Sequence, residues 1–283
     1  MTHSKPSSLM LVSVIASLVA IHSSVGVFAM LLYVRQRSRI VTYLQLAFLV
    51  IVTVANSLLF YQTMANSDSN VPTNIGVILT YFSILGIELT NLKVLELFII
   101  LDPRITRKRM IALTIFVFLL FTTSITFKLL EIFLGGDTIH KMRRISYIAF
   151  LTVSFIHSNL QSAYLIRLVY ITTPQRLKTL AQEQVDYYSN MTIYFASQER
   201  KLKMIRVIFK TLMIYVLLFV LDCSVIVVAT SGSDSPIVSE LKSQYSVGIT
   251  SIRLSLNIVL CHLLSELVQC CDPDKIFLYG NPR

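Results

Sequence analysis

The chain alternates between long apolar stretches and short polar connections. A transmembrane helix needs roughly 20 mostly apolar residues to cross the hydrocarbon core of a bilayer, and seven stretches of this sequence are long enough. All seven prolines lie outside the interiors of these stretches or at their extreme ends, as expected for unbroken helices. The pattern predicts an all-α membrane protein, a seven-transmembrane helix bundle forming one domain over residues 1–283. The predicted spans cover about 8–34, 40–62, 75–101, 110–134, 145–171, 204–230 and 246–268.

Basic residues gather in every second connection, which predicts the direction of each crossing. Lysine and arginine close to the end of a transmembrane helix stay in the cytoplasm. The first, third and fifth connections are therefore predicted to be cytoplasmic, with the N-terminus outside and the C-terminus inside. The fourth connection carries Lys141, Arg143 and Arg144 on the predicted outer side, against this trend. The basic residues of the odd connections are Arg35, Arg37, Arg39, Arg104, Arg107, Lys108, Arg109, Arg176, Lys178, Arg200, Lys201 and Lys203.

The fifth connection, residues 172–203, is predicted to be a long cytoplasmic loop with helical ends. Its first part, residues 175–184, consists of good helix formers that could extend the fifth span. Its last part, Gln198–Met204, reads as a helical lead into the sixth span. The only glycosylation sequon of the chain starts at Asn190. Because this loop is predicted to be cytoplasmic, we expect Asn190 to stay unglycosylated.

Residues 269–283 are predicted to form a short cytoplasmic tail. Its first cysteines, Cys270 and Cys271, follow the seventh span at the cytoplasmic edge of the membrane, where S-palmitoylation is common. Unmodified interfacial thiols are the alternative for this pair. The other two cysteines, Cys223 and Cys261, fall inside spans, so no disulfide is expected in the outer loops.

Composition narrows the class of protein further. Only 14% of the residues are charged and 54% are hydrophobic, whereas about 25% are charged in an average soluble chain. A net charge of +10 would suggest nucleic-acid binding in a soluble protein. Here the basic residues flank predicted spans, where they set topology and meet anionic cytoplasmic lipid. Membrane lipids, and not nucleic acids, are therefore the predicted partners of these basic residues.

Ionisable residues inside the predicted spans are the candidate functional residues, because they are costly in a membrane and face the bundle interior by default. The third span holds Glu88, Asn91, Lys93 and Glu96, so we expect it to lie centrally in the bundle. Asp222 in the sixth span and Arg253 in the seventh come at a similar depth, about 10–12 Å from the outer end at 1.5 Å per residue. Equal depth on consecutive helices predicts a salt bridge between them.

A ligand site is predicted at the same depth, where a pocket would lie in an outward-open bundle. His22, Glu88 and His157 come somewhat deeper, and Tyr81 and Asn159 extend the polar lining. The alternative is that these groups only join neighbouring helices through hydrogen bonds and ion pairs. Lys128 and Glu131, near the outer end of the fourth span, are expected to pair at the rim. The predicted ligand-binding residues are Tyr81, Glu88, His157, Asp222 and Arg253.

No sequence motif indicates catalysis. The chain has no His-Glu-x-x-His, no paired metal-ligand spacing and no glycine-rich phosphate loop. His22, His157 and His262 fall on three different predicted spans. We therefore expect no enzymatic activity, no metal and no cofactor.

The whole architecture resembles a G-protein-coupled receptor, with a short outer N-terminus, a long third cytoplasmic loop and cysteines after the seventh span. Residues 199–221 look like the basic entry and apolar run of a receptor sixth helix. Leu101-Asp102-Pro103-Arg104 is loosely similar to the Asp-Arg-Tyr of rhodopsin-like receptors, although Pro103 separates the acid from the arginine. An Asn-Pro-x-x-Tyr motif in the seventh span and tryptophan are both absent. Arg37-Ser38-Arg39 and Ile87-Glu88 are faintly similar to fungal alpha-factor mating receptors, and nematode chemoreceptors are similar in kind.

This resemblance implies a plasma-membrane receptor of the chemosensory or pheromone type. An extracellular ligand would bind in the outer half of the bundle, and a heterotrimeric G protein would bind at the cytoplasmic ends of spans three, five and six. Two other hypotheses use the same polar residues: a small-solute transporter or channel, and a membrane scaffold whose polar groups only pack helices. Homodimerisation is left open by the sequence. The residues predicted to face the G protein are Asp102, Arg104, Lys201 and Lys203.

Overall fold

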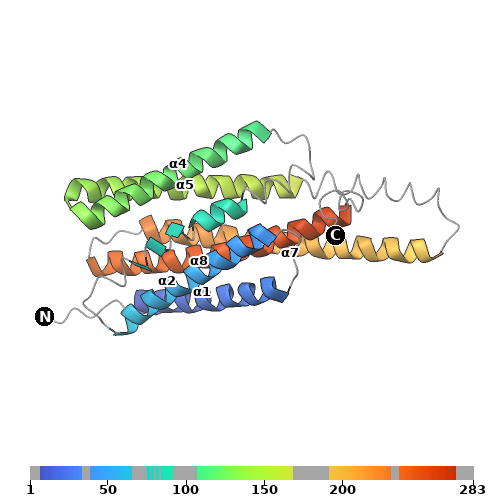
Figure 1. Ribbon diagram of the computed structural model, residues 1–283, viewed down its shortest axis with the longest axis horizontal. Helices are drawn as coiled ribbons and strands as arrows, with labels where there is room; N and C mark the ends of the chain where they lie inside the picture. Colours follow the sequence, from blue (N-terminus) through green and yellow to red (C-terminus); the bar gives the residue numbers. More distant parts are fainter. Residues whose placement is uncertain are drawn as a thin grey trace.

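The computed structural model describes residues 7–33, 39–65, 75–91 except 77, 80 and 83, 107–167, 191–230 and 236–271. Each of these residues is helical apart from the Gly135-Gly136 turn. Residues 75–91 contribute helical turns to the bundle (teal in Figure 1). The long helices are α1 (Ser7–Tyr33), α2 (Arg39–Ala65), α4 (Arg107–Leu134), α5 (Asp137–Arg167), α7 (Met191–Thr230) and α8 (Pro236–Cys271).

The helices confirm that this is an all-helical, multi-pass membrane protein in its described part. Among the described residues, five helical stretches are long and apolar enough to cross a membrane. Helix α5 is not among them, and it carries polar residues both in its first turns, at Asp137, Lys141 and Arg143, and further along, at His157 and Asn159. The sixth and seventh crossings therefore stay predictions for α5 and for residues 75–101. The five stretches are Met10–Tyr33, Thr42–Met64, Thr114–Leu134, Leu202–Val228 and Gln244–Leu267.

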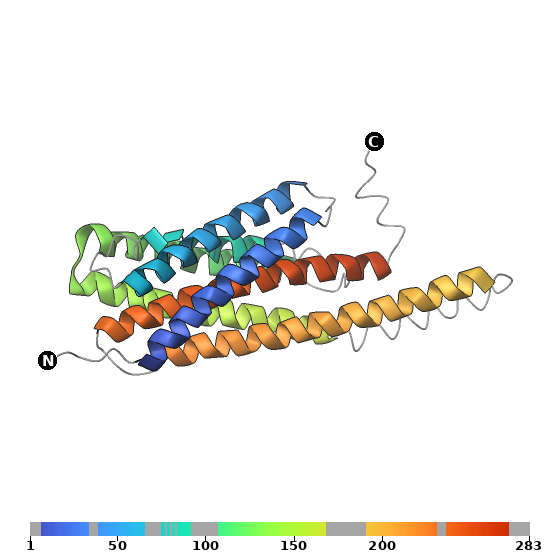
Figure 2. The same cartoon turned by 90° about the horizontal axis from the view of Figure 1, so that it is seen from below.

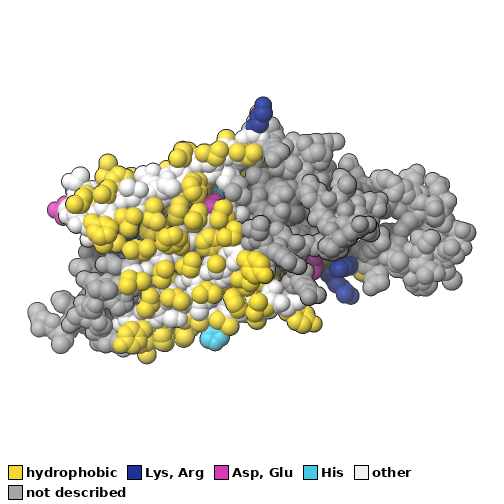
Figure 3. Space-filling model, in the orientation of Figure 1, with side chains coloured by type: hydrophobic (Ala, Val, Ile, Leu, Met, Phe, Trp, Pro, Cys, Tyr) yellow, Lys and Arg dark blue, Asp and Glu magenta, His cyan; other side chains and the backbone are white. Residues whose placement is uncertain are grey.

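Helix α8 is the central element of the bundle. It contacts α1, α2 and α7, while α4 pairs with α5, and α5 contacts α7 (Figures 1 and 2). Within its apolar stretch 67% of the residues are buried, against 17–33% in the other four stretches. The outer helices turn large apolar side chains outward, and yellow side chains cover much of the face in Figure 3. An apolar exterior of this kind suits lipid, because apolar side chains need no hydrogen bonds from water.

Residues 75–91 lie between the two halves of the bundle, in keeping with the central position expected for the third span. Ile87 packs in a buried cluster with Leu49 of α2 and Leu254 of α8. Tyr81 and Ile84 instead belong to a cluster formed with α4 and α5. One short segment thus contacts both halves of the bundle.

Small residues let α1 and α8 approach each other closely. Ala16 of α1 is buried against Gly248 of α8, and a Cβ added at Gly248 would lie 3.0 Å from the Ala16 carbonyl carbon. Ser13 Oγ donates to the Leu241 carbonyl oxygen across the same contact, at 3.0 Å. Helix association in membranes depends on such close packing, because lipid removes the hydrophobic driving force between helices.

Helix α7 is much longer than a membrane crossing. Its apolar stretch, Leu202–Val228, is preceded by a polar helical extension from Met191 to Lys201. This confirms the helical lead expected over Gln198–Met204 and carries it further toward the N-terminal side. The extension reaches past the other helices of the bundle (Figure 2). The expected helix over residues 175–184 lies outside the described residues.

Candidate functional site

Asp222 of α7 and Arg253 of α8 form a buried ion pair. The Arg253 Nη1 atom lies 3.2 Å from Asp222 Oδ1, and the two residues are 6% and 8% exposed. The salt bridge predicted from their equal depth is therefore confirmed. It joins α7 to the central helix at a level where both side chains are surrounded by protein, away from water that would weaken their attraction.

The ion pair uses only part of its hydrogen-bonding capacity. Within the described part of the chain, Arg253 Nε and Nη2 and Asp222 Oδ2 are buried without a hydrogen-bond partner. Asn257 Nδ2, one helical turn further along α8, is in the same condition. Each unsatisfied buried group costs about 1–3 kcal/mol, and a bidentate arginine–carboxylate contact would have satisfied most of these atoms. Among the described residues, the ion pair between α7 and α8 therefore presents free donors and a free acceptor, and Asn257 adds a free donor on α8.

A second buried pair joins α5 to residues 75–91. His157 Nδ1 of α5 is 3.9 Å from Glu88 Oε2, and the residues are 1% and 2% exposed. This distance is beyond hydrogen-bond range but close enough for electrostatic attraction when the imidazole is protonated. Arg253 also lies close enough to His157 for the two side chains to interact electrostatically. Four of the predicted ligand-binding residues thus come together from residues 75–91, α5, α7 and α8.

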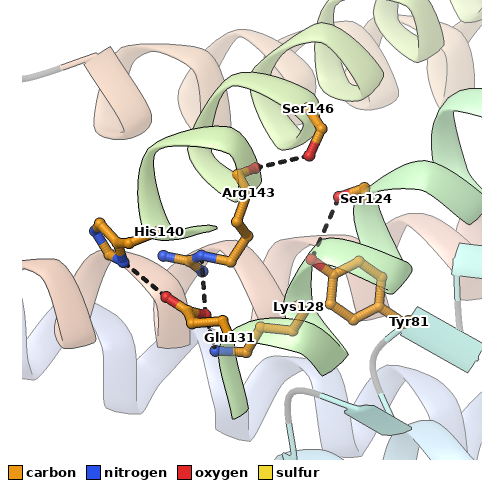
Figure 4. A network of polar contacts seen from close by, with 7 residues as sticks. All are labelled: Tyr81, Ser124, Lys128, Glu131, His140, Arg143 and Ser146. Carbon is orange, nitrogen blue, oxygen red and sulfur yellow. Dashed lines mark hydrogen bonds and ion pairs between the residues drawn. The ribbon is translucent and has the colours of Figure 1, made fainter. Parts of the chain in front are cut away.

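Tyr81, the fifth predicted ligand-binding residue, belongs to a different group. Its hydroxyl lies 3.4 Å from Ser124 Oγ of α4 (Figure 4). Its ring is 6.1 Å from the ring of Phe121. Its electrostatic neighbours are Arg143 and Glu131, near the α4–α5 turn, and not the Asp222–Arg253 pair. The sequence placed Tyr81 in the right span, but the helix rotation directs it to α4.

A polar cluster surrounds the α4–α5 turn. Glu131 Oε2 accepts from Lys128 Nζ at 2.9 Å and lies 3.1 Å from Arg143 Nε. Its other oxygen, Oε1, lies 2.6 Å from His140 Nδ1 (Figure 4). Gly135 and Gly136 have φ values of 64° and 101°, which side chains disfavour, so glycine permits the tight reversal between the helices. The expected Lys128–Glu131 rim pair is confirmed, and Arg143 joins it.

Replacing Glu131 with glutamine should loosen this turn. The substitution leaves Lys128, Arg143 and a protonatable His140 facing one another without the carboxylate that holds them. We expect a loss of about 1.5 kcal/mol, the lower end for a hydrogen bond to a charged group, because the cluster is partly exposed. Thermal melting and amide hydrogen exchange around Gly135 would measure it. Lys141→Gln, an exposed charge removal on the adjoining helix α5, should leave both unchanged. Equal effects of the two variants would contradict a structural role of Glu131.

The remaining predicted site residues are only partly described. Asp102 and Arg104 lie outside the described residues, as do the side chains of Asn159 and Lys201. Lys203 is exposed at the start of the apolar stretch of α7, and Cys270 and Cys271 are the last residues of α8. His22 is exposed on α1, where Nδ1 lies 2.8 Å from the Leu18 carbonyl oxygen, so it does not line the interior.

Several hydroxyl contacts that join the helices were not predicted. Tyr147 of α5 is hydrogen-bonded to Ser246 of α8 at 2.8 Å, and Asn56 of α2 donates to Ser251 of α8 at 2.7 Å. Tyr245 donates to Ser224 of α7 at 3.0 Å. The signal available in the sequence was the recurrence of serine along the seventh span, since hydroxyls in membrane helices bond to neighbouring helices.

Comparison with known proteins adds no family to this picture: no protein-family model, no curated protein and no solved structure matches the chain. Among the described residues, no group of three His, Cys, Asp or Glu is placed to hold a metal ion. The class defined by the fold is a multi-pass helical membrane protein, and its most unusual feature is the incompletely bonded ion pair between α7 and α8.

Proposed function

We propose that the protein is a seven-span cell-surface receptor of the G-protein-coupled kind, which binds an extracellular ligand among its helices. The observation that carries this proposal is the convergence of Glu88, His157, Asp222 and Arg253 from four helical elements into the buried interior. Ionisable residues inside a membrane mark ligand or ion sites by default. The basic connections predict that the N-terminus and the outer end of this interior face the cell exterior.

The long α7 helix provides a route from this interior to the cytoplasm. Asp222 lies near one end of the apolar stretch of α7, and the polar extension Met191–Lys201 continues from the other end. Lys203, exposed at the start of that stretch, is on the predicted cytoplasmic side. A shift of α7 against α8 at the ion pair would therefore move the extension that a cytoplasmic partner could contact.

A ligand drives such a shift only if it binds the two arrangements with different affinity. The two arrangements would differ at the Asp222–Arg253 contact, because this contact joins α7 directly to the central helix. A ligand bound at the contact would therefore have a different affinity for each arrangement. A ligand that takes over some of its hydrogen bonds stabilises the arrangement in which those atoms are accessible. The predicted consequence is a change in the position of α7 relative to α8, and not a change of fold.

Nucleotide exchange on a panel of purified heterotrimeric G proteins tests this function. The receptor, reconstituted in lipid, should accelerate exchange, with or without extracts of its native surroundings as a source of ligand. Arg104→Ala, on the predicted cytoplasmic side, should abolish the acceleration, whereas Arg144→Ala, an exposed basic residue on the predicted outer side, should not. No acceleration by correctly folded protein would oppose the proposal, and solute flux into the same vesicles would then test transport.

The orientation has its own test at Asn190, which lies outside the described residues. With a cytoplasmic fifth connection, the Asn190 sequon is never exposed to the glycosylation machinery of the secretory pathway. In mammalian cells the protein should therefore migrate unchanged after glycosidase treatment. A sequon placed in an N-terminal tag is the positive control and should be glycosylated. A glycosidase-sensitive band that disappears in Asn190→Gln would invert the topology and remove the receptor proposal.

A further inference from the structure

We propose that the Asp222–Arg253 site takes an uncharged ligand group that carries a hydrogen-bond donor next to an acceptor, as an amide does. The inference rests on the proposed function for the presence of a ligand, and it adds the chemistry of the group that binds. It is based on buried atoms that have no hydrogen-bond partner among the described residues: Arg253 Nε, Arg253 Nη2 and Asp222 Oδ2 at the ion pair between α7 and α8, and Asn257 Nδ2 one helical turn further along α8.

The kind of these atoms selects the ligand group. Arg253 Nε, Arg253 Nη2 and Asn257 Nδ2 are donors, so the ligand has to supply an acceptor. Asp222 Oδ2 is an acceptor, so the ligand has to supply a donor as well. Arg253 and Asp222 form one ion pair with a contact of 3.2 Å, so their free atoms belong to the same site. Asn257 follows Arg253 by four positions and therefore lies on the same face of α8.

The balance of charge at the ion pair excludes a charged ligand group. The charges of Asp222 and Arg253 already balance each other, and a further charge at the pair would be buried without a partner, which is costly. A carboxylate ligand would satisfy the donors but add a negative charge beside Asp222. An ammonium ligand would leave all three donor groups unsatisfied and add a positive charge beside Arg253. An amide satisfies donors and acceptor together: its carbonyl accepts from Arg253 or Asn257, and its N–H donates to Asp222.

Four small benzene derivatives of similar size test the proposal on the unmodified protein in lipid nanodiscs. Benzamide has a donor and an acceptor, acetophenone has only the acceptor, benzoate is an anion and benzylamine is a cation at neutral pH. We expect benzamide to raise the melting temperature in a saturable manner at millimolar concentration. The other three compounds should have apparent Kd values at least about tenfold higher, because each loses at least one hydrogen bond to a charged group. Benzoate or benzylamine stabilising as well as benzamide would overturn the inference, as would identical effects of benzamide and acetophenone.

Substitutions on α8 test whether benzamide binds at this site. Asn257→Leu removes one of the free donors and should weaken benzamide binding several-fold while leaving the protein folded, because it deletes an amide nitrogen that has no partner in the described structure. Glu266→Gln, a charge removal on the same helix at a half-exposed position, is the matched control and should leave benzamide binding unchanged. Benzamide binding unaffected by Asn257→Leu would place the probe elsewhere and refute the site. Melting is measured without a G protein, so the ligand site and the receptor function are tested separately. Selective benzamide binding without nucleotide exchange would support the site and reject the receptor function. Nucleotide exchange without selective benzamide binding would support the receptor function and reject the site.

Discussion

Arg253→Gln should strongly reduce the amount of folded protein. The substitution leaves the Asp222 carboxylate buried at 6% exposure without its counter-charge, and removing one partner of a buried ion pair typically costs about 3–5 kcal/mol. Because Arg253 lies on the central helix, the loss affects the interface of α8 with α7 and not a peripheral contact. Fluorescence-detected gel filtration and thermal melting in nanodiscs would measure it. Glu266→Gln on the same helix should fall within the range of ordinary surface substitutions.

A charge-swapped double variant distinguishes direct pairing from two independent defects. Asp222→Asn should destabilise the protein by an amount similar to Arg253→Gln, because either change leaves one buried charge alone. Asp222→Arg and Arg253→Asp should each be at least as harmful by themselves. Combined in one chain they restore opposite charges across the 3.2 Å contact, so the double variant should be more stable than either single variant. A double variant no better than the singles would contradict direct pairing.

Gly248→Val should separate α1 from α8. A Cβ at this position would lie 3.0 Å from the backbone carbon and from the Cβ of Ala16, and a backbone cannot move aside as a flexible side chain can. Valine adds two methyl groups beyond that Cβ, so we expect a loss of about 1–3 kcal/mol, the usual cost of inserting volume into a packed contact. Thermal melting measures the loss of stability. The separation itself can be measured by disulfide cross-linking between α1 and α8 or by a spectroscopic distance between labels on the two helices.

Gly26→Ala is the matched control for this prediction. Gly26 lies on α1, and a Cβ added there meets nothing within 4 Å. Alanine is the better helix former by about 1 kcal/mol, so Gly26→Ala should leave stability unchanged or slightly raised. If both substitutions proved neutral, α1 and α8 would not be in the close contact described at Ala16 and Gly248.

The predicted spans agree with the helices because both depend on the same physical requirement. A run of apolar residues long enough to cross a bilayer must be helical, since only a helix satisfies all its backbone hydrogen bonds locally. The first span was predicted at about 8–34 and α1 covers Ser7–Tyr33; the fourth was predicted at about 110–134 and α4 covers Arg107–Leu134. The extra length of α7 and α8 was underestimated, because polar residues continue a helix outside the membrane without leaving an apolar signal.

The pairing of Asp222 with Arg253 was accessible from the sequence for a simple geometric reason. Consecutive helices joined by a short connection are neighbours, and depth along each helix follows from the rise per residue. Two opposite charges at one depth on neighbouring helices therefore have few other partners. The same reasoning holds within one helix for Lys128 and Glu131, three positions apart. Neither case requires knowledge of how distant helices pack.

The sequence by itself determined the helices, their class of environment and the pairs that depend only on depth or on spacing along a helix. Only the tertiary structure decided which helices meet and how each is rotated about its axis. That rotation directs Tyr81 to Ser124 of α4 and turns His22 outward, while it brings Glu88 and His157 together in the buried interior. The physical reason is that an apolar helix in lipid has no strong amphipathic face, so its rotation is set by packing against neighbours that the sequence does not order.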